Sequence, residues 1–166
     1  MQPWLHRGVT TGEWVMLSYR LPREPSAPRT TLWRRLKRLG VAQLSDGLVA
    51  LPADARTREQ FEWAADDVVS SGGTAGVWLA RPTTVAQERT LAQGMAAARS
   101  VEYEALVEQC RAVVAAEPDE RRRALRRLRA ESRAIGRRDF FPPAARDEAA
   151  AALRELQRSL TVEPVR

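Results

Sequence analysis

The sequence of 166 residues is poor in the side chains that carry most catalytic and metal chemistry, since it has one cysteine, Cys110, and one histidine, His6. A single cysteine excludes an internal disulfide and a cysteine-based metal cluster within one chain. A Ser-His-Asp triad would have to recruit His6, and a zinc site would have only two soft ligands. We therefore predict a protein that is not an enzyme, with no catalytic residues, no metal site and no cofactor.

Long apolar runs are also missing. The longest uncharged run, residues 68–80, is interrupted by Ser70, Ser71, Gly72 and Gly73. It falls short of the roughly 18 consecutive apolar residues that span a membrane. Residues 1–12 lack the apolar segment that a secretory signal needs. We expect a cytoplasmic protein with no membrane partner.

Acidic residues are scarce in two segments, so the charge is unevenly distributed along the chain. The formal net charge is +6. Residues 20–38 hold seven cations against one acid, and residues 117–139 hold nine arginines against five acids. Charge runs are often no more than solvated faces. Clustering of this kind nevertheless favours a polyanionic partner such as nucleic acid.

The pattern of apolar residues predicts an α+β fold. In order, we predict a strand at 14–21, a helix at 29–39, a hairpin at 41–51, a helix at 57–71 and a strand at 74–80. The strands are rich in β-forming residues, and the helices repeat their apolar residues with a period near 3.6. This βαββαβ order predicts a ferredoxin-like antiparallel sheet of four strands with two helices on one face.

Local signals predict how several of these elements begin and turn. Thr30 or Thr31 is expected to cap the first helix, and Thr57–Gln60 is expected to form the capping box of the second. Asp46-Gly47 is expected to form a type I′ turn. Trp33, beside the leucines of the first helix, is expected to pack into the core.

Beyond Thr84 the periodicity is helical only. Helices are predicted at 101–116, from Pro118 to Gly136 and near 144–160. The domain prediction is a flexible N-terminal arm at 1–12, a ferredoxin-like unit at 13–82 and a helical C-terminal extension at 83–166 that packs on it. Cys110 falls on an apolar helical face, which favours an inert core thiol.

The residues best suited to contact a ligand are the cations of the first predicted helix. Its polar face carries four cations and no acid, which is more than solvation requires. Arginine forks match phosphate oxygens, and a helix followed by a tight hairpin is typical of some DNA readers. The predicted nucleic-acid-binding residues are Arg29, Arg34, Arg35, Lys37 and Arg38.

The ordered set of motifs resembles the N-terminal domain of ChrB chromate-resistance regulators. The motifs are the strand at 14–21, the proline loop, Trp33 to Gly40, Asp46-Gly47 with Leu51-Pro52, and Asp-Phe-Phe-Pro at 139–142. The resemblance spans roughly Glu13 to Pro143. It implies a DNA-binding transcriptional regulator whose partner is double-stranded DNA. We expect a homodimer, since a protein with two-fold symmetry can contact the two half-sites of a DNA operator at once.

The resemblance also implies chromate or a related oxyanion as a candidate effector. Arg20, Arg23 and Arg29 bracket the start of the first helix, where guanidinium forks and a helix N-terminus suit a tetrahedral dianion. These three residues are the predicted oxyanion site, although the same side chains suit DNA phosphate equally well.

Two alternative functions stay open. The βαββαβ unit is also similar to that of CRISPR-associated metal-dependent nucleases, which carry an acid near the end of the first strand. Ser18-Tyr19-Arg20 occupies that place here, so a nuclease relative would be inactive or would use other acids. The second alternative is a protein-interaction adaptor whose C-terminal helices bind another chain.

Overall fold

The structure is a computed structural model that describes residues 12–161. His6 and the predicted arm at 1–12, apart from Gly12, therefore lie outside the described residues. The chain divides into two compact units, residues 1–95 and 96–166. Within the described part of the chain, none of the helices is long and apolar enough to cross a membrane.

The first unit has the predicted order of strands and helices. Its elements are β1 (Trp14–Arg20), α1 (Ala27–Leu39), β2 (Ala42–Ser45), β3 (Leu48–Pro52), α2 (Ala55–Ser70), β4 (Thr74–Ala80) and the first turns of α3 (Val85–Val113). The predicted α+β class with a four-stranded antiparallel sheet is confirmed.

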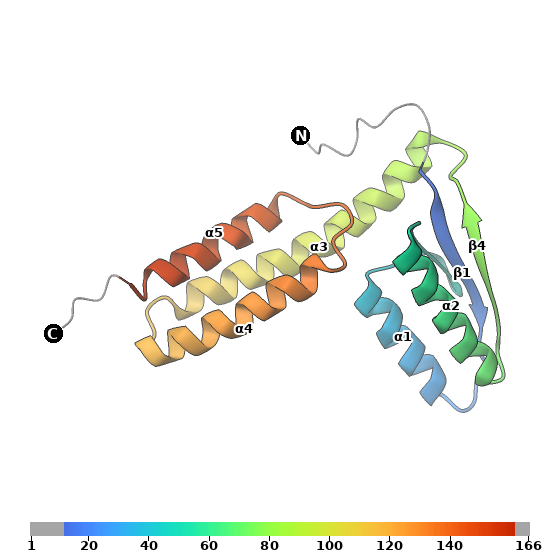
Figure 1. The fold of residues 1–166 in the computed structure, drawn as a ribbon, viewed down its shortest axis with the longest axis horizontal. Coiled ribbons are helices and arrows are strands. Elements are labelled where there is room, and N and C mark those ends of the chain that lie inside the picture. The colour runs from blue at the N-terminus through green and yellow to red at the C-terminus, as the bar shows by residue number, and fades with distance from the viewer. Residues whose placement is uncertain (1–11, 162–166) are drawn as a thin grey trace. The chain divides into compact units, whose positions relative to one another are not determined.

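The strands of the sheet lie in the order β2-β3-β1-β4. Leu17 of β1 pairs with Val49 of β3 on one side and with Val77 of β4 on the other. Each helix thus connects two strands that are separated by a third. Figure 1 shows α1 and α2 side by side on the same side of the sheet, and α2 packs against β1 and β4.

The core of the first unit lies between the sheet and these two helices. Val15 and Leu17 of β1 are fully buried, as is Phe61 of α2. Burying a side chain of this size contributes roughly 1.5–3 kcal/mol. At the start of β1, the indole Nε1 of Trp14 donates to Glu88 Oε1 at 3.2 Å, and this bond joins the start of α3 to the sheet.

Both helices begin earlier than the sequence predicts. The expectation that Thr30 or Thr31 caps α1 is wrong, because the N-cap is Ser26 and Pro28 lies in the first turn. Proline suits that turn, since its missing N–H would have no partner there in any case.

The capping box of α2 is also formed by different residues. Asp54 is the N-cap: its Oδ1 accepts from Thr57 N at 2.6 Å, and its own N donates to Thr57 Oγ1 at 2.9 Å. The predicted box at Thr57–Gln60 is therefore wrong. Asp54 and Thr57 have the three-residue spacing that a capping box needs, and aspartate is a stronger N-cap than threonine.

The hairpin turns at Asp46-Gly47 as predicted, but not with the predicted geometry. Gly47 has a φ of 74°, whereas no non-glycine residue among those described has a positive φ. A type I′ turn needs positive φ at both central residues, so that prediction is wrong. The strand register also shifts between Gln43 and Ser45, so the pairing of β2 with β3 is irregular just before the turn.

The second unit contains the rest of α3, α4 (Pro118–Gly136) and α5 (Ala145–Arg158). Its core is formed by Tyr103, Leu106, Val107, Cys110, Ala124, Leu125, Leu128, Ile135, Ala145, Ala149, Leu153 and Leu156. The predicted limits of α4 at Pro118 and Gly136 are confirmed. Cys110 is buried as predicted, and burial raises the pKa of its thiol.

A buried hydrogen bond ties the segment after α4 to α3. The Tyr103 hydroxyl donates to Asp139 Oδ2 at 3.0 Å, and the Asp139 side chain is fully buried. Burial raises the pKa of Asp139. The nearest opposite charge recorded for its carboxylate is Arg146, whose Nη1 lies 3.9 Å from Oδ2. Tyr103 therefore supplies the main short contact of this carboxylate.

This packing predicts an unusual tyrosine titration. Burial and the Asp139 carboxylate raise the pKa of Tyr103 to about 12. An unfolded tyrosine ionises near pH 10, so the free energy of unfolding should fall as the pH rises from about 10 to 12. In the folded protein, tyrosinate absorbance should show one ionisation near pH 12 that Tyr103→Phe removes. Tyr19→Phe is the control, and a Tyr103 midpoint close to 10 would contradict the packing.

Candidate nucleic-acid interface

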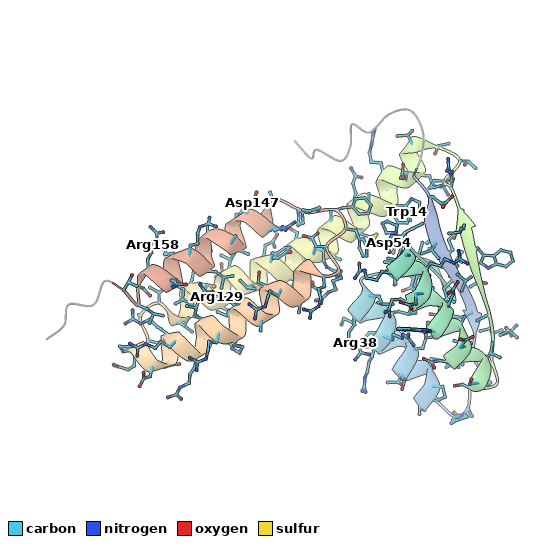
Figure 2. The ribbon with its side chains drawn as sticks, viewed as in Figure 1. Trp14, Arg38, Asp54, Arg129, Asp147 and Arg158 are labelled. Carbon is cyan, nitrogen blue, oxygen red and sulfur yellow. The ribbon has the colours of Figure 1, made fainter. Side chains whose placement is uncertain are left out.

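Helix α1 has one buried side and one cationic side. Leu32 and Leu36 are 6% and 4% exposed, and the helix contains no acidic residue. Arg34, Lys37 and Arg38 are exposed on the remaining arc, and Figure 2 shows Arg38 on the side of α1 away from α2. We call Trp33, Arg34, Lys37 and Arg38 the cationic face.

Two guanidinium groups of this face are unpaired. Within residues 12–161, Arg34 and Arg38 form no ion pair or hydrogen bond through their side chains. Their four-residue spacing places them one turn apart on the same side of the helix. The face therefore presents two guanidinium forks with all donors available to a ligand.

Trp33 belongs to this face and not to the core. Its side chain is 57% exposed, so the expectation of a core tryptophan is wrong. Each residue turns an α-helix by about 100°, which carries Trp33 to the edge of the stripe that Leu32 and Leu36 bury. Lys37 Nζ lies 4.9 Å from the centroid of the indole ring, a cation–π contact that positions the ammonium group on the face.

Arg35 points away from the cationic face. Its Nη1 lies 2.5 Å from Asp67 Oδ2 on α2, and its side chain is only 20% exposed. The pair lies beside a hollow of about 450 Å³ between α1 and α2, which Leu32 and Val68 also line. The Asp67 carboxylate compensates the Arg35 charge, so Arg35 is the least accessible of the five predicted nucleic-acid-binding residues.

The three residues predicted to hold an oxyanion lie along the connection from β1 to α1. Arg29 Nη2 donates to the carbonyl of Pro22 at 2.8 Å, which braces that connection. Arg20 and Arg23 are exposed. Arg20 lines a shallow hollow of about 380 Å³ with Tyr19, Thr74 and Trp78, but Arg23 and Arg29 do not line it. A joint site of all three arginines stays a prediction.

Trp78 in that hollow is a surface residue that the sequence analysis did not single out. The side chain is 60% exposed, and its Nε1 donates to Ser18 Oγ at 3.0 Å. A Cβ at Gly76 would lie 3.0 Å from Trp78 Nε1, so the indole rests over this glycine. The sequence did contain a signal for this arrangement, namely a glycine two residues before a tryptophan in a predicted strand. Residues i and i+2 share one face of a strand, so the indole can lie over the glycine.

Carboxylates and other metal ligands are not gathered in the same way. In the part of the chain that the structure describes, no group of three or more histidine, cysteine, aspartate or glutamate side chains could hold a metal ion. The cationic face itself offers guanidinium, ammonium and indole groups.

The chain thus combines an α+β unit, whose helix α1 has a cationic face, with a helical second unit. Residues 29–162 match the family described as "Protein ChrB, N-terminal". The matched range includes all four residues of the cationic face. The chain belongs to this family, as its motifs indicated. Neither the curated proteins nor the solved structures include a significant match to this sequence.

The orientation of Arg35 can be tested with a double-mutant cycle. Because the Asp67 side chain is 70% exposed, we expect a coupling of about 0.2–1 kcal/mol between Arg35→Ala and Asp67→Ala in urea unfolding. The matched control pairs Arg35→Ala with Asp66→Ala, whose exposed carboxylate has no partner among the described residues. Equal coupling in both cycles would contradict the ion pair.

Proposed function

We propose that this protein is a DNA-binding transcriptional regulator of the ChrB type, and that the cationic face of α1 contacts the phosphate backbone of duplex DNA. The observation that carries the proposal is the pair Arg34 and Arg38, exposed and unpaired on a helix without an acid. Family membership supports the same function.

Guanidinium groups in this arrangement suit phosphate better than other ligands. Each fork donates two parallel hydrogen bonds to the oxygens of one phosphate, and it keeps its charge at every physiological pH. Lys37 adds a third charge, and the exposed Trp33 indole adds a planar surface next to it. Binding releases counterions from the DNA, so the affinity should depend steeply on salt.

We further propose that the first unit is ferredoxin-like. The βαββαβ order and the strand order β2-β3-β1-β4 support it, because each helix connects two strands that flank a third. This is the arrangement of a split βαβ motif. It keeps α1 and α2 on one side of the sheet, where the outer side of α1 stays open to a ligand.

Chromate or a related oxyanion is the proposed effector, with Arg20, Arg23 and Arg29 as the candidate contacts. Arg20 and Arg23 have no ion pair among the described residues, and Arg29 has donors left besides the one that binds Pro22. The proposal also includes a non-enzymatic, cytoplasmic protein that binds DNA as a homodimer. Two copies would present two α1 helices to two half-sites.

Neutralising the two unpaired arginines should weaken DNA binding. We expect Arg34→Gln with Arg38→Gln to lower the affinity for duplex DNA by about tenfold or more at low salt. The slope of log K against log salt should become shallower by about 0.9 for each lost phosphate contact. Fluorescence anisotropy of a labelled duplex at several salt concentrations measures both quantities.

The matched control is Arg89→Gln with Arg154→Gln, which removes the same charge from two other exposed helix positions. It should leave the affinity within about twofold of the starting protein, because neither position belongs to the proposed contact and salt screens a change in net charge. An equal loss in both double variants would show that net charge alone matters. Unchanged DNA binding in the Arg34 and Arg38 variant would exclude α1 as the contact.

A further inference from the structure

Helix α4 in the second unit carries a larger arginine surface than α1. We call Arg122, Arg123, Arg126, Arg133 and Arg137 the arginine face of α4; all five are exposed. Their spacing brings them to one side of the helix, since residues three, four, seven and eleven apart share a face. Arg121 is not part of it, because its side chain is buried and donates to the Ser159 carbonyl at 2.7 Å.

The opposite side of α4 packs into the core of the second unit, so the arginine face is directed toward solvent. Leu125, Leu128 and Ile135 are buried in the core of the second unit. On one flank Arg127 donates to Gln109 of α3, and on the other Arg129 donates to Gln157 of α5. These bonds leave the arc between the two flanks as the outward surface of α4.

Within residues 12–161, three of the five arginines of this face have no compensating partner. Arg122 pairs with Asp119 in the first turn, with 2.7 Å between Nη1 and Oδ1. The side chains of Arg123, Arg126 and Arg133 have no ion pair or hydrogen bond to any residue in the described range. After the first turn the only acid of α4 is Glu131, which is half-buried and accepts from Gln109.

Such a row of like charges destabilises its own helix. Arg122 and Arg126 are four residues apart, as are Arg129 and Arg133, and like charges at this spacing repel each other. A polyanion would relieve the repulsion. The row from Arg122 to Arg133 is about 16 Å long at 1.5 Å per residue, which covers about five phosphates of one DNA strand at 3.4 Å each.

The chemistry of the face favours a nucleic-acid backbone over a lipid surface. Interfacial helices insert large apolar side chains next to their cations. The exposed side of α4 offers only small side chains between its arginines, such as Ala130. It also has no aromatic residue for base stacking, in contrast to α1 with Trp33. The face is thus suited to phosphates and not to bases.

We infer that the arginine face of α4 is a second contact for the phosphate backbone of duplex DNA, one that does not depend on DNA sequence. The inference rests on the part of the proposed function that makes duplex DNA the ligand, and not on the contact through α1. It adds that part of the affinity, and of its salt dependence, resides in the second unit of the chain.

The test uses the whole chain and three substitutions that break no described contact: Arg123→Gln, Arg126→Gln and Arg133→Gln together. The matched control is Arg89→Gln, Arg154→Gln and Arg158→Gln, which lowers the net charge equally at exposed sites on α3 and α5. Circular dichroism first verifies that both variants are folded. Anisotropy with a duplex of arbitrary sequence then gives the affinity across a salt series, and vesicles of phosphatidylserine and phosphatidylcholine form a parallel arm.

We expect the α4 variant to lose about tenfold or more in duplex affinity at low salt, with a slope shallower by about 0.9 per lost contact. The control should stay within about twofold. Equal affinities of the α4 variant and the control would overturn the inference, as would a loss of vesicle binding with duplex binding intact.

The Arg34 and Arg38 variant, measured beside these, separates the two proposals. If it loses DNA binding while the α4 variant does not, the inference about α4 is wrong and the α1 contact stands. If only the α4 variant loses binding, the α1 contact is wrong and the inference about α4 stands. Absence of duplex binding in the starting protein overturns both.

Discussion

The burial of Leu32 and Leu36 is the constraint on which the candidate interface depends. These two side chains fix the rotation of α1 about its own axis, because a turn of 100° would expose both of them. With the rotation fixed, Arg34, Lys37 and Arg38 face solvent and Arg35 faces α2. The leucines thus determine which of four neighbouring cations can reach a ligand.

Opposite charges are separated between the two helices that cover the sheet. Helix α1 has no acid, whereas the solvent side of α2 carries four acids, Glu59, Glu62, Asp66 and Asp67, against two arginines, of which Arg58 pairs with Glu62. At their boundary Asp67 compensates only Arg35. The outer side of α1 is therefore more positive than α2, which favours the approach of a polyanion from the α1 side.

Much of the fold could be predicted from the sequence, because periodicity, proline and glycine report on local structure. The order of elements, the end of α1 at Gly40 and both limits of α4 are confirmed. The start of α2 was missed because the sequence contains two possible capping boxes, Asp54 with Thr57 and Thr57 with Gln60. Their three-residue spacing is the same, so spacing alone does not decide between them. The turn at Asp46-Gly47 was misassigned because the dipeptide alone does not fix the φ of Asp46, which is not positive here.

The candidate interface was predictable in composition but not in detail. Residue types and spacing placed a cation-rich helix at 29–39, yet they could not show that Arg35 pairs with a residue 32 positions later. That pairing depends on how α1 packs against α2. Trp33 was assigned to the core for the same reason, since the width of the buried stripe is set by the neighbouring helix.

Titration of isotope-labelled protein with duplex DNA, followed by NMR, tests the central claim most directly. We predict that the first backbone amide and indole signals to shift belong to Trp33, Arg34, Lys37 and Arg38, and that the signals of Leu32 and Leu36 change less. Unshifted α1 signals, together with shifts at Ser18 and Trp78 on the sheet, would contradict it.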